Sequence, residues 1–138
     1  MGDLIANPFE DYIYVGIVSS LALLMLYFTM FRSGIARGKY KVDAPSHEGP
    51  EDYVRLVRAH QNTIEHMAMF LPGMWLFAIA VDPLWAAGLG LYWTICRVFY
   101  ALGYARSAND RRIPLYLSMP VVYTFLLGPL IGFILMLT

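Results

Sequence analysis

The sequence is poor in charge and in cysteine, and both shortages exclude common classes of protein. Only 14% of its 138 residues are charged, 59% are hydrophobic, and the mean hydropathy is +0.54. A soluble domain carries about 25% charged residues, so this composition indicates an integral membrane protein. The single cysteine, Cys96, excludes an internal disulfide and is expected to pack rather than to react.

Basic residues are absent from the start of the chain, from its end and from the region around Asp82. All ten Lys and Arg fall within two segments, 32–58 and 97–112. A signal peptide needs a basic start, so the apolar run 12–31 is expected to be a retained helix. The sequence also has no phosphate-binding glycine loop and no His or Cys spacing suited to a metal, so no metal site is expected.

Four long apolar segments predict an all-α integral membrane fold, a bundle of four transmembrane helices that forms one domain over residues 1–138. Helices of about 20 residues match a hydrocarbon core of about 30 Å. The ranges expected are 9–36, 51–81, 83–107 and 113–138. Pro83 and Pro114 are suited to the first positions of the third and fourth helices.

The distribution of basic residues also predicts the topology. With four spans, segments 32–58 and 97–112 place both basic loops on one side of the membrane. The positive-inside rule makes that side cytoplasmic and sends both termini outward. The membrane would be the plasma membrane in a bacterium or the endoplasmic reticulum in a eukaryote.

The expected second helix contains the polar stretch "RLVRAHQNTIEH", residues 55–66. At 100° per residue, four of its side chains fall within an arc of about 80°. They are Arg55, Arg58, Asn62 and Glu65. The third helix repeats the pattern, because Arg97, Tyr100 and Tyr104 share a face and Arg106, Arg111 and Arg112 follow. The polar faces of the second and third helices are therefore expected to meet at the same depth in the membrane.

These charges have a structural and a functional interpretation. Arg and Glu could form ion pairs between helices, and tyrosines near an interface could belong to an aromatic belt. However, Arg55, Arg58 and Arg97 carry three positive charges. Glu65 supplies one negative charge, which leaves two positive charges that each cost at least ~2.5 kcal/mol in a membrane. An anionic ligand would supply the missing partners.

The side chains suit a peptide-like ligand with two carboxylates and one ammonium. Arg forks would bind the carboxylates, Glu65 the ammonium and Asn62 an amide. Glutathione has these groups, as do other zwitterionic anions.

The motifs "RLVRAHQNTIEH" and "RVFYALGYARSANDRR" resemble those of the MAPEG family, the membrane-associated proteins of eicosanoid and glutathione metabolism. They are similar to segments of its microsomal glutathione transferases and leukotriene-C-forming synthases. The resemblance implies a homotrimer of four-helix subunits that binds glutathione between neighbouring subunits, facing the cytosol. His66 and His60 stand where the leukotriene-forming branch has tyrosine and glutamine, so leukotriene and prostaglandin substrates are not assigned.

The resemblance also implies roles for individual residues. Arg111 takes the place of the arginine that holds the thiolate, with the adjacent Arg112 as the alternative. Arg97 matches a basic position that contacts the ligand or serves the structure. The glutathione-binding residues implied are Arg37, Arg58, Asn62, Glu65, Arg97, Tyr100 and Tyr104.

The function implied is glutathione transfer to lipophilic electrophiles, with glutathione-dependent reduction of lipid hydroperoxides as a side activity. The expected partners are glutathione as cosubstrate, hydrophobic electrophiles, membrane lipids and further copies of the chain, without nucleic acid. Two alternatives remain. One is a non-enzymatic lipid-binding or scaffold protein of the same family. The other is a small exporter, which is disfavoured because the interior of the first helix has no ionisable residue.

Overall fold

The computed structural model describes residues 7–138, which form helices and no strands. The elements are a 3-10 helix, η1 (Glu10–Tyr12), and the helices α1 (Ile13–Lys39), α2 (Glu51–Ala80), α3 (Pro83–Arg106) and α4 (Arg112–Met136). The predicted all-α class with four helices is confirmed, and the predicted helix ends differ from these by at most four residues. Residues 1–6 of the predicted domain lie outside the described part.

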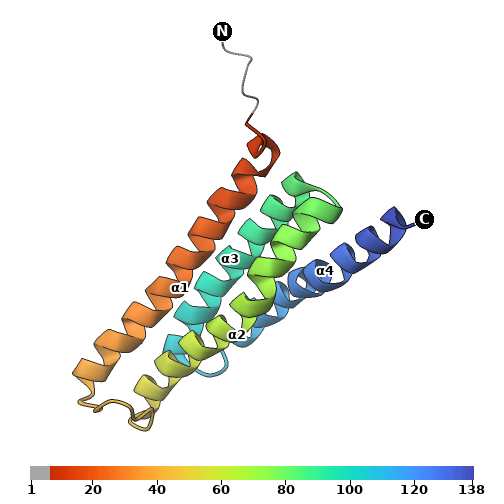
Figure 1. The fold of residues 1–138 in the computed structure, drawn as a ribbon. Helices are drawn as coiled ribbons and strands as arrows, with labels where there is room; N and C mark the ends of the chain where they lie inside the picture. The colour runs from red at the N-terminus through yellow and green to blue at the C-terminus, as the bar shows by residue number, and fades with distance from the viewer. Residues whose placement is uncertain (1–6) are drawn as a thin grey trace.

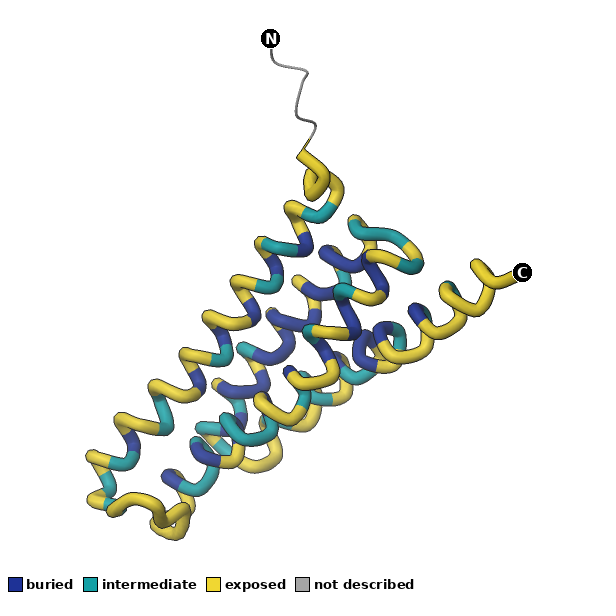
Figure 2. The backbone as a smooth tube through the Cα atoms, in the orientation of Figure 1, coloured by how far each residue is buried: buried dark blue, intermediate teal, exposed yellow. Residues whose placement is uncertain are grey.

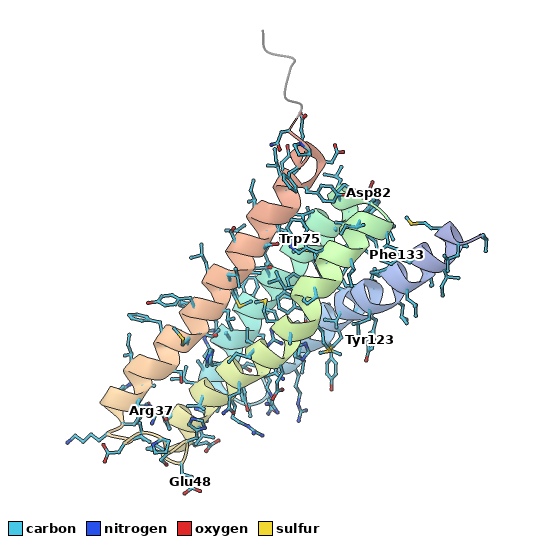
Figure 3. The ribbon with its side chains drawn as sticks, viewed as in Figure 1. Arg37, Glu48, Trp75, Asp82, Tyr123 and Phe133 are labelled. Atoms are coloured by element: carbon cyan, nitrogen blue, oxygen red, sulfur yellow. The ribbon has the colours of Figure 1, made fainter. Side chains whose placement is uncertain are left out.

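The four helices lie side by side as a bundle, and α4 diverges from the others toward its C-terminus (Figure 1). The α1–α2 and α3–α4 connections lie at one end of the bundle, and the α2–α3 turn lies at the other. Figure 3 places Arg37 and Glu48 at the first end and Asp82 at the second. Both basic segments therefore reach the same end, which we call the basic end.

Within residues 7–138, three helical segments are long and apolar enough to cross a membrane: Glu10–Lys39, Glu51–Ala80 and Arg112–Met136. The fourth helix, α3, has 24 residues and is also long enough. Its apolar run is interrupted by Arg97 and contains several glycines and tyrosines, which lower its hydropathy. Buried residues concentrate where α1, α2 and α3 face one another, whereas most of the outer surface is exposed apolar side chain (Figure 2).

The core is built on aromatic rings and on glycines that let the helices approach. Phe70 of α2 stacks on Trp93 of α3 with ring centroids 3.7 Å apart. On α4, a Cβ at Gly132 would lie 2.8 Å from the carbonyl oxygen of Ala80, so α2 and α4 meet there backbone to backbone. Cys96 is buried with 7% of its surface exposed, as a packing residue would be.

A capping side chain and two prolines lie where α3 and α4 begin. Asp82 caps α3 by accepting a hydrogen bond from the Trp85 backbone N–H at 2.8 Å, and Pro83 takes the first helical position, as predicted. Pro114 is instead the third residue of α4, because that helix begins at Arg112. Since the first-turn N–H groups have no intrahelical partner, proline is tolerated at this position too.

Candidate functional site

A polar cavity of about 200 Å³ opens between α2 and α3, near the basic end of the bundle. Seven residues line it: Arg58, Gln61, Asn62 and Glu65 of α2, Tyr100 and Tyr104 of α3, and Arg111 at the start of α4. Six of the eight residues that the sequence predicts for the site are among them. Arg37 and Arg97 are not.

The α2 wall follows from helical spacing. Arg58, Asn62 and Glu65 lie four and three residues apart and share one face of the helix. Gln61 lies on the same face, three residues after Arg58, and sequence analysis missed it although this spacing signals it. Its amide nitrogen lies 3.2 Å from Nδ1 of His47, in the α1–α2 connection. This connection therefore touches the rim of the cavity.

The cavity holds charges that are not paired within the described part of the chain. The ion pairs found within residues 7–138 both belong to Arg55, which bonds Glu51 at 3.1 Å and also bonds Asp52. Neither the guanidinium groups of Arg58 and Arg111 nor the Glu65 carboxylate takes part in one. The charge count from the sequence set Arg55, Arg58 and Arg97 against Glu65 alone. It is corrected here, because Glu51 and Asp52 in the first turn of α2 pair with Arg55.

Arg97 lies beneath the cavity rather than in its wall. Its side chain is 0% exposed, and Nη2 donates to Asn62 Oδ1 and to Thr63 Oγ1, both at 2.9 Å. The guanidinium lies over the ring of Tyr100, 4.0 Å from its centroid. Because Nε and Nη1 have no acceptor among the described residues, this cation–π contact compensates part of the charge. Of the two roles that the resemblance implies for Arg97, ligand contact or structure, its position one layer below the wall favours the structural one.

The α3 wall positions Arg111. Tyr100 and Tyr104 are one turn apart, with ring centroids 5.8 Å from each other, and the Arg111 guanidinium lies 4.3 Å from the Tyr104 ring centroid. The short connection after α3 folds back on Gly103, where a Cβ would lie 2.7 Å from the Asp110 carbonyl oxygen. Glycine at this position lets the chain turn tightly enough to bring Arg111 over Tyr104. The adjacent Arg112 is exposed and lies outside the lining.

Arg37 lies apart from the other predicted site residues, at the end of α1 (Figure 3). Its Nη1 donates to the Ser46 carbonyl at 2.9 Å, and its guanidinium lies 5.8 Å from the Tyr53 ring centroid. Tyr53, which is fully buried, also donates from its hydroxyl to the Ser46 carbonyl at 3.3 Å. Within one chain, Arg37 therefore fastens the α1–α2 connection and does not reach the cavity.

Comparison of the sequence with known proteins identifies its family. The MAPEG family model matches residues 15–132. The chain is 40% identical over 103 residues to an uncharacterised protein of Synechocystis, a match that covers 75% of each chain. It is 38% identical over 96 residues to microsomal glutathione S-transferase 2 of Bos taurus, covering 70% of this chain and 65% of the relative. It is 31% identical over 129 residues to leukotriene C4 synthase of Rattus norvegicus, covering 91% of this chain and 86% of the relative. The chain belongs to the MAPEG family.

Proposed function

We propose that the protein is a membrane-bound glutathione transferase that joins the glutathione sulfur to lipophilic electrophiles. The observation that carries the proposal is the set of groups around the cavity. It offers two guanidiniums, from Arg58 and Arg111, and one carboxylate, from Glu65, without ion-pair partners in the described chain. Glutathione brings two carboxylates, one ammonium and an ionisable thiol, which complement these charges.

Each group has a natural part in this arrangement. Arg58 presents a planar fork suited to a carboxylate, and Glu65 accepts from the ammonium. Arg111 faces the cavity over the Tyr104 ring, which leaves its N–H groups free to donate to the glutathione sulfur. A guanidinium at this point favours the thiolate over the thiol.

The gain from ionisation alone is small. A thiol with a pKa near 8.5 is only ~3% thiolate at pH 7, and lowering that pKa by two units, about 2.7 kcal/mol, makes most of it thiolate. Nucleophilicity falls with the pKa, by about tenfold for a Brønsted slope near 0.5, so the net gain is a few-fold. Holding the sulfur beside a bound electrophile must supply the larger part of the rate.

An apolar groove between α3 and α4 offers a place for the electrophile. Its volume is about 380 Å³, and it is lined by Leu89, Tyr92, Tyr116, Leu117, Pro120, Val121 and Thr124. Tyr116 lies five residues after Arg111, which is about 7.5 Å along a helix. The near end of the groove is thus about one and a half helical turns from Arg111, and a lipophilic molecule could enter it from the membrane.

The chemistry balances without a further reagent. The thiolate sulfur forms a bond to the electrophilic carbon, and either a leaving group departs or the adduct takes up a proton. We include lipid hydroperoxide reduction in the proposal. There the thiolate attacks the O–O bond to give an alcohol and a glutathione sulfenic acid, and a second glutathione converts the sulfenic acid to the disulfide and water.

The proposal includes a homotrimer, with the site completed between neighbouring subunits and the basic end in the cytosol. Two features support it. The cavity is open on the single chain, with Arg58 and Glu65 both exposed. Arg37 does not reach the cavity of its own chain, so as a glutathione-binding residue it would have to act on a neighbour's site. The basic end carries the ten Lys and Arg, as the positive-inside rule requires of a cytoplasmic end.

The first experiment is an ultraviolet difference titration of the detergent-solubilised protein with glutathione at neutral pH, which follows the thiolate band. We expect a saturable band in the wild type and its loss in Arg111→Ala. Turnover in that variant should fall about tenfold or more, while glutathione affinity changes less, because Arg111 acts mainly on the sulfur.

Arg112→Ala is the matched control, because Arg112 is adjacent but lies outside the cavity. It should keep the band and most of the turnover. Loss of the thiolate band in Arg112→Ala but not in Arg111→Ala would show that Arg112, and not Arg111, holds the thiolate. If the wild type shows no band and calorimetry detects no glutathione binding, the transferase proposal is wrong and a lipid-binding protein becomes the better account.

A further inference from the structure

The hydrogen bond between Arg97 and Asn62 links a buried cation to a residue of the cavity wall. Arg97 is fully buried, whereas Asn62 is half-buried and lines the cavity. Nη2 of Arg97 lies 2.9 Å from Oδ1 of Asn62 and 2.9 Å from Oγ1 of Thr63. These three side chains form one connected network between α3 and α2.

The direction of every hydrogen bond in this network is fixed by chemistry. The Thr63 hydroxyl donates to the Ala59 carbonyl at 2.8 Å, so its oxygen meets Arg97 with lone pairs only. A guanidinium has five N–H donors and no acceptor, so its partners must all be acceptors. An amide and a guanidinium can therefore meet at 2.9 Å only when the amide oxygen faces the guanidinium.

This constraint decides what Asn62 can offer a ligand. With its oxygen held by Arg97, the Asn62 NH₂ group is directed away from Arg97, and it forms no hydrogen bond within residues 7–138. An asparagine free to rotate could serve either a donor or an acceptor on the ligand. In Asn62 the oxygen already accepts from Arg97, and the group left without a partner is the NH₂, which serves an acceptor on the ligand.

We propose that Arg97 is a positioning residue that fixes Asn62 as a hydrogen-bond donor, so that the ligand group opposite Asn62 is a carboxylate or a carbonyl. The inference rests on the proposed function and deepens it. Among the groups of glutathione, it excludes the ammonium from this part of the cavity and leaves Glu65, one turn further along α2, as the acceptor for it. It also gives the buried arginine a role that needs no contact with the ligand.

The change in glutathione affinity caused by Asn62→Asp tests whether Asn62 donates to the ligand. In Asn62→Asp, one carboxylate oxygen pairs with Arg97 and the other faces the ligand as an acceptor of nearly the same shape. We expect glutathione to bind about tenfold or more weakly than to the wild type, and more weakly than to Asn62→Ala, because two acceptors then face each other. Affinity would be measured by calorimetry in detergent. Binding to Asn62→Asp as tight as to the wild type, or tighter, would show that Asn62 serves a ligand donor and overturn the inference.

A double-mutant cycle tests the positioning role. Arg97→Met should weaken glutathione binding several-fold when Asn62 is present and have little effect in the Asn62→Ala background, because Arg97 acts through Asn62. An equal loss in both backgrounds would mean that Arg97 acts on the ligand directly. Arg97→Gln keeps an N–H donor toward Asn62 and should retain most of the affinity, and it carries the test if Arg97→Met does not fold. Wild-type protein that fails to bind glutathione would instead overturn the proposed function.

Discussion

The two halves of α2 differ in how they hold the neighbouring helices. Residues 51–65 include five charged side chains, and residues 66–80 include none. In the first half, polar side chains of α2 line the cavity, and Asn62 and Thr63 accept hydrogen bonds from Arg97 of α3. In the second half, contacts are made by aromatic rings and by backbone that approaches closely through glycine.

The apolar half shows this close approach at two places. A Cβ at Gly128 of α4 would lie 2.8 Å from the Phe77 ring, and a Cβ at Gly132 would lie 2.8 Å from the Ala80 carbonyl oxygen. Small residues give helices in a membrane the contact that the hydrophobic effect does not supply there. The comparison shows that the close approaches through α4 glycines belong to the apolar half, whereas the polar half lines the cavity.

The largest effect is expected for binding, at Glu65. We expect Glu65→Ala to raise the dissociation constant for glutathione roughly tenfold to hundredfold, because the ligand ammonium loses its acceptor. The thermal midpoint should stay close to that of the wild type, since Glu65 is exposed and has no ion pair within the described chain. Calorimetry and thermal unfolding in detergent measure the two quantities.

Glu51→Ala is the matched control for Glu65→Ala. Glu51 is an exposed carboxylate on the same helix, outside the cavity, and it pairs with Arg55. Its removal should leave glutathione affinity nearly unchanged. Equal losses of affinity in the two variants would point to a general effect of charge at the basic end instead of a specific acceptor.

The second-largest effect is a loss of stability, which is expected for Gly132→Ala. Gly132→Ala should lower the free energy of unfolding by about 1–3 kcal/mol, because the added methyl forces α2 and α4 apart at the Ala80 carbonyl. Glutathione affinity should remain near the wild-type value. In the control Gly16→Ala the new methyl meets nothing within 4 Å, so stability should change little. A large loss of affinity in Gly132→Ala would show that the two halves of α2 are coupled.

The smallest effect is expected at Arg55, which belongs to the polar half but not to its cavity. Arg55 pairs with Glu51 and Asp52, whose side chains are 83% and 61% exposed. Solvent reaches both carboxylates and screens the pairs, which then contribute about 0–1 kcal/mol. The Arg55 stem, in contrast, is packed, with its side chain only 13% exposed. Arg55→Met, which keeps the packed stem and removes the charge, should therefore lower stability by less than about 1 kcal/mol and change glutathione affinity by less than about twofold. A tenfold loss of glutathione affinity would show that Arg55 also contributes to the binding site.

Much of the fold could be predicted because the signals are periodic and local. Apolar runs of membrane-spanning length gave the four helices, and the Asp82-Pro83 pair gave the start of α3. Spacing along one helix also predicted that Arg58, Asn62 and Glu65 share a face. These properties depend on the geometry of a single helix.

The depth of a side chain in the bundle could not be predicted in the same way. Arg97 and Tyr100 share a face of α3, yet only Tyr100 lines the cavity, because Arg97 lies beneath Asn62 of a neighbouring helix. The position of Arg97 depends on a neighbouring helix, which helical spacing does not specify.

Arg55 shares a face with Arg58, but it pairs with Glu51 and Asp52, which lie in the first turn of α2. The Arg55 pairs stand at i, i+3 and i, i+4 spacing, so the sequence did contain that signal.

The tight turn at Gly103 has a consequence for how such a protein can diversify. The turn fastens the segment before Arg111 to the end of α3, through the close approach of Gly103 and the Asp110 carbonyl. The side chains of α4 that line the apolar groove begin five residues later, at Tyr116. Mutations along α4 could therefore reshape the groove while Arg111 keeps its anchor. Under the proposed function, substitutions on one helix would then change which lipophilic substrates fit the groove and leave the position of Arg111 as it is.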